Sequence, residues 1–220
     1  MTATPARPRG VAALLLCVLL LAGCASVQQT RQLDDFKTLA AKGDYAAIAA
    51  RDVNCDATDP ACAQAQLIKG DACYRLAQAG DASRYACAAD ALGAGLAAPG
   101  LDQPAATRAA YAANRCEALR QARDRISGPP ALARNKELAA CAQALETLSP
   151  GSAAARFFAV NAGLAAVQVS PTNATTCARL DGLAASLRER EGAAAASGLD
   201  APYRRLGNDL QLTRRGFGCR

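Results

Sequence analysis

Hydrophobic residues recur along the chain every three to four positions, the spacing that places them on one face of an α-helix. The pattern is clear at Leu33, Phe36 and Leu39, and it resumes over residues 46–53 after a break at Gly43-Asp44-Tyr45. Few stretches alternate with the period of two that a half-buried strand requires. We therefore expect an all-α protein without a sheet.

The same spacing predicts helices as far as the end of the chain, separated by glycine and proline. After residue 99 they are expected over residues 105–126, 131–148, 153–169, 175–191 and 202–215, with a small-residue connection over 192–198. The stretch 153–169 is the most apolar and is expected to run through the centre. We expect about nine helices, in a single domain covering residues 24–220.

Composition changes the expected character of the core. Alanine dominates, tryptophan is absent and aromatic residues make up only 4% of the chain. Alanine is the best helix former and leaves little side chain between helix axes. The sequence therefore predicts helices that approach one another closely.

Two stretches of the chain repeat the same break between helices. Residues 39–45 (LAAKGDY) and 76–82 (LAQAGDA) each turn at Gly-Asp, and Gly80 follows Gly43 by 37 residues. Periods of this size are typical of stacked helical hairpins. Over about residues 33–99 the chain resembles tetratricopeptide (TPR) and Sel1-like repeats. The resemblance implies a TPR-like α-solenoid of stacked antiparallel helical hairpins, with further hairpins over 100–220. The ten residues from Gly70 to Gly80 exceed the TPR spacing.

The first 23 residues have the pattern of an export signal. Two arginines and no acid precede a short apolar run over residues 11–21. A membrane-spanning helix needs ~20 apolar residues. The run ends in Leu21-Ala22-Gly23-Cys24, which resembles a bacterial lipobox. The resemblance implies that residues 1–23 are a signal peptide and that Cys24 is lipidated. An uncleaved anchor or a buried helix is the alternative.

The resemblance to a lipobox also implies a location. Ala25 rather than aspartate follows Cys24, which by analogy with Gram-negative sorting favours the outer membrane. The helical pattern begins soon after Cys24, so the folded part is expected close to the bilayer, facing the periplasm. Such a compartment is oxidising.

Eight cysteines follow Cys24, an even number that indicates disulfides in this compartment. In an antiparallel helix pair, residues equidistant from the turn lie at the same height, as a disulfide requires. Pairs of these cysteines are centred on Thr58-Asp59, on Gly80, between Gly128 and Pro129, and on Gly198. The predicted pairs are Cys55–Cys62, Cys73–Cys87, Cys116–Cys141 and Cys177–Cys219. Two alternatives stay open: Cys87 could pair with Cys62, which shares a helix face with Cys73, and the cysteines could be free core thiols.

Few residues suggest catalysis or metal binding. The sequence contains no histidine and no C-x-x-C pair, so histidine-dependent triads are excluded and a zinc site is not expected. Gly93, Gly95 and Ala98 match a dinucleotide fingerprint but follow no predicted strand. Two carboxylate pairs, Asp34 with Asp35 and Glu189 with Glu191, lie on polar helical stretches. We expect no cofactor, no metal and no enzymatic activity.

Partner contacts are expected in two regions. Tyrosines and arginines near the first two turns form the first set: Tyr45, Tyr74, Arg75, Arg84 and Tyr85. The C-terminal helix supplies four arginines on roughly one face, suited to anionic lipid or an acidic protein: Arg204, Arg205, Arg214 and Arg215. The full chain carries a net charge of +6, which becomes +4 without Arg7 and Arg9. Nucleic acid is not expected, because aromatic residues do not interleave with the basic ones.

These observations predict a non-catalytic adaptor or assembly factor that binds another envelope protein at the outer membrane. Stacked hairpins offer an extended concave surface, which commonly holds peptides or helices. A structural lipoprotein that binds peptidoglycan is one alternative, and a glycan-cleaving enzyme that uses only carboxylates is another. The sequence leaves the oligomeric state open.

Overall fold

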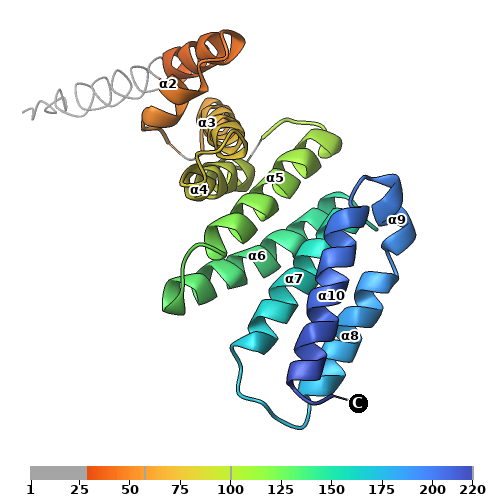
Figure 1. Cartoon of the computed structure of the whole chain (residues 1–220). Coiled ribbons are helices and arrows are strands. Elements are labelled where there is room, and N and C mark those ends of the chain that lie inside the picture. Colours follow the sequence, from red (N-terminus) through yellow and green to blue (C-terminus); the bar gives the residue numbers. More distant parts are fainter. Residues whose placement is uncertain (1–28, 57, 100, 220) are drawn as a thin grey trace, which may run out of the picture.

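A computed structural model describes residues 29–56, 58–99 and 101–219, and within these ranges it contains helices and no strand (Figure 1). The chain is helical over residues 29–41 and then forms helices α2 to α10. Their bounds are α2 (Tyr45–Ala50), α3 (Pro60–Gln78), α4 (Arg84–Ala97), α5 (Ala105–Arg123), α6 (Gly128–Leu148), α7 (Ala153–Gln168), α8 (Thr176–Arg188), α9 (Glu191–Ala196) and α10 (Asp200–Gly216). The prediction of an all-α fold is confirmed.

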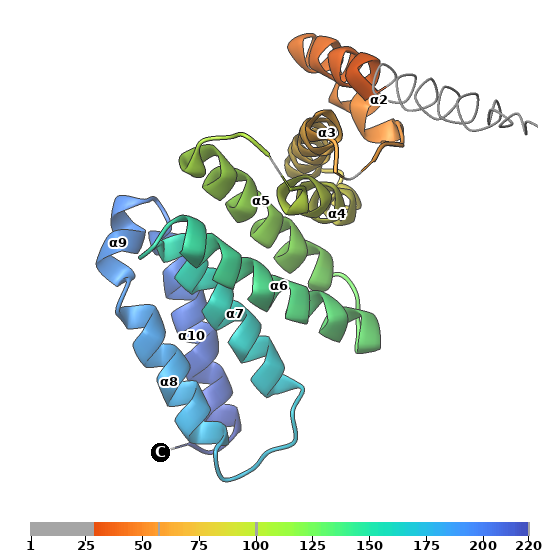
Figure 2. The same ribbon diagram turned by 180° about the vertical axis from the view of Figure 1, so that it is seen from behind.

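The helices form a stack of hairpins. Each helix from α2 to α7 packs on the next one in the chain, and α8 packs on α10. The odd-numbered helices α3, α5, α7 and α9 also contact one another in turn. Figures 1 and 2 show the result: the first helical segment and α2 at one end, then α3 and α4, then α5 and α6, and α7 beside α8 and α10 at the other end. Neighbour-to-neighbour packing of this kind is typical of a solenoid.

The two predicted Gly-Asp turns have the same geometry. Asp44 N–H donates to Leu39 O at 3.0 Å, and Asp81 N–H donates to Leu76 O at 3.1 Å. Gly43 and Gly80 both have positive φ, as this helix end requires. The same bond closes the helix ends at Gly198 and Gly218. It is therefore a general helix stop, and the tetratricopeptide resemblance stays a prediction.

The core consists largely of alanine, leucine and two phenylalanines, and it extends from α2 to α10. Helix α7 lies at the centre of the C-terminal half, since it contacts α5, α6, α8, α9 and α10. A smaller cluster around Phe36 and Ile48 joins the first helical segment to α3. Phe36 and Ile48 are fully buried, so this small cluster holds the first helical segment and α2 against α3.

Several predicted boundaries were wrong: α5 ends at Arg123 rather than residue 126, α8 ends at Arg188 rather than residue 191, and three others differ as well. Helix α6 begins at Gly128 rather than residue 131, because Pro129 and Pro130 are tolerated in a first turn, where N–H groups have no partner in the helix. The connection expected over 192–198 contains α9, whose Ala194 is fully buried. Helix α2 ends at Ala50 instead of continuing to residue 53.

The four disulfides join the predicted cysteines. Cys55 bonds Cys62, Cys73 bonds Cys87, Cys116 bonds Cys141 and Cys177 bonds Cys219, with Cα–Cα distances of 5.6, 5.9, 5.6 and 5.5 Å. The last three each close a helical hairpin or helix pair, and Cys55–Cys62 ties the link after α2 to the first turn of α3. The alternative pairing of Cys87 with Cys62 is excluded.

A buried arginine joins three helices of the middle layer. Arg123 at the end of α5 is only 9% exposed, and its guanidinium donates to Asn135 Oδ1 of α6 at 2.7 Å and to Asn161 Oδ1 of α7 at 2.8 Å. Asn135 in turn donates to Ala162 O at 2.9 Å. Asp124 Oδ1 lies 2.6 Å from Arg123 Nη2 and compensates its charge. Every polar group of this network therefore has a partner, as burial demands.

Candidate protein-binding groove

A groove of about 330 Å³ lies where α3, α5, α7 and the start of α10 come together. Its lining is mainly aromatic and aliphatic, with a polar side contributed by α5. We name it the tyrosine–phenylalanine groove, and its lining residues are Tyr74, Ala113, Asn114, Glu117, Arg120, Ala154, Phe157, Phe158, Leu199 and Pro202. The odd-numbered helices supply most of this surface, so the groove follows the side on which they contact one another.

The floor of the groove is rigid. The ring of Phe157 packs edge-on to Phe158 with centroids 5.3 Å apart, and it stacks on Tyr203 at 6.1 Å. The buried Tyr203 hydroxyl donates to Ala153 O at 2.7 Å. This bond ties α10 to the first residue of α7 and fixes the aromatic rings that line the groove.

Tyr74 forms one wall of the groove. Its ring packs edge-on to Tyr85 of α4, with centroids 6.2 Å apart. Burial, followed by the nearby charge of Glu117, raises the pKa of Tyr74 to about 12. The Arg125 guanidinium lies 5.1 Å from the Tyr85 ring centroid on the other side. Tyr74 is therefore a neutral, half-buried side chain with an apolar ring and one hydroxyl.

The polar side of the groove carries a compensated pair of charges. Arg120 donates to Glu117 with N–O distances of 2.6 and 2.9 Å, and it also contacts Asp124 at 3.3 Å. Asn114 lies one turn before Glu117 on the same helix. An apolar floor beside amide, carboxylate and guanidinium groups suits a peptide segment with apolar side chains and polar backbone groups.

The predicted contacts of the first two hairpins divide between the groove and its surroundings. Tyr74 lines the groove and Tyr85 supports it. Arg75 instead lies over the Tyr45 ring at 5.2 Å and bonds Asp71 at 2.7 Å, and Arg84 bonds Asp81 at 3.0 Å. The contact between Arg75 and Tyr45 therefore joins α3 to α2, and Arg84 pairs within its own turn.

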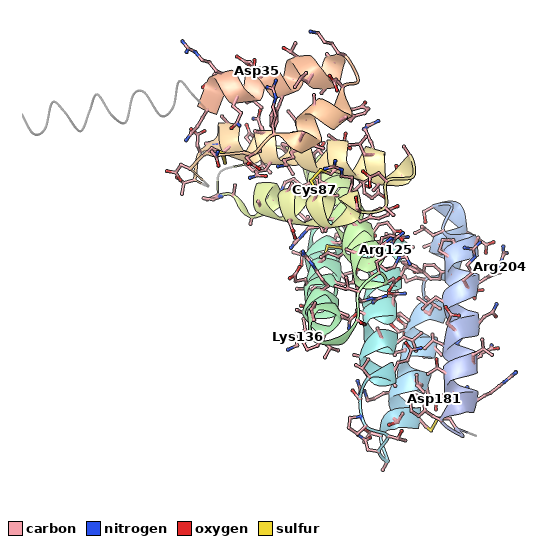
Figure 3. The ribbon with its side chains drawn as sticks, turned by 60° about the vertical axis from the view of Figure 1, so that its left-hand side comes forward. Asp35, Cys87, Arg125, Lys136, Asp181 and Arg204 are labelled. Atoms are coloured by element: carbon pink, nitrogen blue, oxygen red, sulfur yellow. A yellow bond between two sulfur atoms is a disulfide. The ribbon has the colours of Figure 1, made fainter. Side chains whose placement is uncertain are left out.

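Two of the four arginines predicted on α10 form ion pairs. Arg204 pairs with Asp200 on the same helix, whereas Arg214 turns to α8 and pairs with Asp181 at 2.7 Å. Figure 3 shows Arg204 and Asp181 near opposite ends of this bundle. Ten residues correspond to about 2.8 helical turns, so the second arginine pair is rotated by about 80° from the first. Arg205 and Arg215 are exposed.

Other candidate residues do not converge on a site. Asp35 pairs with Arg51 at 3.5 Å at the N-terminal end of the stack, and Glu189 lies 3.9 Å from Arg156 after α8. Gly93 and Gly95 lie inside α4. Among residues 29–56, 58–99 and 101–219, no group of histidine, cysteine or acidic side chains is arranged to hold a metal ion. Cys24 and residues 1–23 lie outside the described residues.

Most residues of the groove escaped prediction. The periodicity of the sequence does not determine the angles at which helices pack on one another. It therefore could not bring together the groove residues Asn114, Glu117, Phe157, Leu199 and Pro202. The adjacent pair Phe157-Phe158 was the one available signal, since it holds half of the four phenylalanines in the chain. It was interpreted only as core.

The fold and the groove together define a disulfide-linked stack of antiparallel helical hairpins with an aromatic groove. No helix in the described part of the chain has the length and apolar character needed to cross a membrane. Comparisons with protein-family models, with curated proteins and with solved structures find no match to this chain.

Proposed function

We propose that this protein is an outer-membrane lipoprotein, held by acyl chains on Cys24, that acts as a non-catalytic adaptor facing the periplasm. The groove would bind a segment of another envelope protein. The observation that supports this function is the aromatic surface formed jointly by α3, α5, α7 and α10. Tyrosine and phenylalanine are enriched where proteins bind one another, because they bury large areas with few rotatable bonds.

The groove favours a short helix or an extended segment with one or two large apolar residues. Phe157 and Leu199 supply the apolar contacts, and Asn114 supplies donors and an acceptor for the partner's backbone. Glu117 and Arg120 already satisfy each other, so neither demands an opposite charge from the partner. A peptide of this chemistry is a common ligand of helical-hairpin stacks.

Site-specific photo-crosslinking in intact cells tests the groove. A photoreactive amino acid at Asn114 should give one discrete adduct with an envelope protein, and the same amino acid at the exposed Lys136 of α6 should not (Figure 3). Ala154→Trp, which fills the groove, should abolish the adduct, whereas Ala140→Trp on the exposed side of α6 should not. An adduct that persists in Ala154→Trp at wild-type thermal stability would contradict the proposal.

The anchor is tested separately. Wild-type protein should incorporate a fatty-acid precursor and fractionate with the outer membrane, and Cys24→Ala should do neither. Retention of unlabelled Cys24→Ala at the membrane would remove the anchor from the proposal. Recovery of the protein with isolated sacculi, and not with solubilised membrane proteins, would favour the peptidoglycan-binding alternative.

A further inference from the structure

A second hollow, of about 380 Å³, lies between α4, α5 and α6. Residues 108, 112 and 115 of α5 face it, whereas residues 113, 117 and 120 face the tyrosine–phenylalanine groove. With 3.6 residues per turn these two sets fall on opposite sides of α5. The hollow is therefore a separate site, independent of the proposed function. We name it the arginine hollow, and its main lining residues are Gly93, Leu96, Arg108, Ala112, Arg115 and Leu148.

Two arginines in this hollow have no acceptor for a buried donor. Arg108 and Arg115 are seven residues apart, two helical turns on one face of α5. The Nε atom of each is buried and has no hydrogen-bond partner in the described part of the chain. Neither side chain forms an ion pair there. Buried donors are nearly always satisfied, so these two groups indicate a ligand that accepts hydrogen bonds.

The nearest acids form their direct ion pairs with a different arginine, Arg134. Asp90 and Glu137 bond Arg134 at 2.6 and 2.8 Å. Burial is the main cause of a lowered pKa for Arg115, the charges of Glu137 and Asp90 oppose this shift, and the cation Arg134 adds to it. A half-buried guanidinium without a directly paired carboxylate carries part of a desolvation cost, which an incoming anion would offset.

Glycine at position 93 makes room for the guanidinium of Arg115. A Cβ atom on residue 93 would lie 2.9 Å from Arg115 Nε and 3.1 Å from Cζ. The backbone at Gly93 does not have positive φ, so glycine is not needed there for a turn. Its lack of a side chain instead leaves space for the Arg115 guanidinium. Glycine inside a helix lowers the stability of that helix, and α4 has a glycine at the position where Arg115 packs.

We propose that the arginine hollow binds a small-molecule carboxylate with an apolar body, such as a short-chain or medium-chain fatty acid. Guanidinium groups bind carboxylates through paired N–H donors, and Leu96, Ala112 and Leu148 would cover the apolar part. The volume of about 380 Å³ falls within the ~300–1,000 Å³ typical of small-molecule sites. The two unpaired arginines beside an apolar wall, which the tyrosine–phenylalanine groove does not have, favour a small carboxylate as the occupant.

Calorimetric titration of the lipidated protein in nanodiscs with octanoate tests this site, with protein-free nanodiscs as the blank. Octanoate should bind at one site, and octanol, which has the same chain without the charge, should not. Arg108→Gln and Arg115→Gln should each weaken binding by about tenfold or more, since each removes charge-assisted hydrogen bonds. Arg125→Gln is the matched control, because Arg125 lies over Tyr85 outside the hollow, and it should leave binding unchanged.

Three results would overturn the proposal. Equal binding of octanol would show that the charge is not recognised. Unchanged octanoate binding in Arg108→Gln and Arg115→Gln, with melting temperatures like those of the wild type, would place the ligand elsewhere. Binding of a peptide with a C-terminal leucine, but not of octanoate, would assign the hollow to a protein segment.

Gly93→Ala is a second variant, and it keeps both arginines. It should weaken octanoate binding, because the added Cβ atom displaces Arg115.

Discussion

Gly70 of α3 faces Leu92 of α4 so closely that a Cβ atom on residue 70 would lie 2.6 Å from Leu92 Cγ. Gly95 of α4 meets Leu67 of α3 in the same way, at 2.7 Å. Each helix thus places a glycine opposite a leucine of the other. This reciprocal fit lets the two axes approach, and it positions Tyr74 and Tyr85 against each other beside the groove.

Replacing Gly70 with alanine should therefore destabilise the protein, although alanine is the better helix former. Overpacking of a closed contact costs ~1–3 kcal/mol in the free energy of unfolding. Gly182→Ala is the matched control, because Gly182 also lies inside a helix, α8, but a Cβ atom on it would meet no other atom within 4 Å. That substitution should stabilise by ~0.5–1 kcal/mol. Denaturant unfolding with intact disulfides measures both, and equal signs would contradict the packing argument.

The disulfides should differ in their contribution to stability according to the loops that they close. Their sequence separations are 7, 14, 25 and 42 residues. Chain entropy then predicts ~2.4 kcal/mol for Cys55–Cys62 and ~3.9 kcal/mol for Cys177–Cys219, with the others between. Double Cys→Ala variants, compared by denaturant unfolding, should follow this order. A larger loss for Cys55–Cys62 than for Cys177–Cys219 would show that local packing outweighs loop entropy.

The pairing of the cysteines could be predicted because it depends on position along the chain. In each hairpin the two cysteines lie at equal distances from the turn, and the turn residues are visible in the sequence. The prolines at 129 and 130 misled the prediction, because proline ends a helix in its interior but begins one in its first turn. The sequence over 192–198 misled it for another reason: small residues were taken for a connection, although alanine is the best helix former.

The groove could not be predicted in the same way. Periodicity indicates which face of a helix is apolar, but it does not determine which helices meet at that face. Phe157 was expected in the core, and it lies at the boundary between core and groove because α10 returns to α7 through the Tyr203 hydroxyl. The prediction grouped the arginines of α10 by their spacing in the sequence. It could not include Asp181 of α8, which forms an ion pair with Arg214.

Loss of Asn135 should weaken the middle of the stack. Asn135→Ala removes the acceptor for Arg123 Nη1 and a second hydrogen bond to Ala162 O, so the buried Arg123 Nη1 loses its partner. Each unsatisfied group costs ~1–3 kcal/mol. Lys136→Ala, at the next position of α6 but exposed, should change the free energy of unfolding by less than ~0.5 kcal/mol. Similar values for the two variants would mean that water replaces the lost bonds.

Alkaline pH should ionise Tyr74 and Tyr203 later than a free phenol. Burial raises the pKa of Tyr74 and of Tyr203 to about 12, against ~10 for a free phenol. In the window from pH 10 to 12 the folded protein keeps phenol protons that the unfolded chain releases. The stability that these two residues contribute is therefore complete below pH 10, and it is lost as the pH rises through 12.

Ultraviolet absorbance of tyrosinate, followed during a pH titration of the folded protein, measures this separation directly. Tyr74→Phe should remove one late-titrating group and should flatten the fall in stability between pH 10 and 12. Tyr45→Phe is the comparison, since Tyr45 lies on the outer hairpin under Arg75 and away from the groove. If Tyr74→Phe removed an early-titrating group instead, Tyr74 would be open to water and the wall of the groove would not be the neutral surface described above.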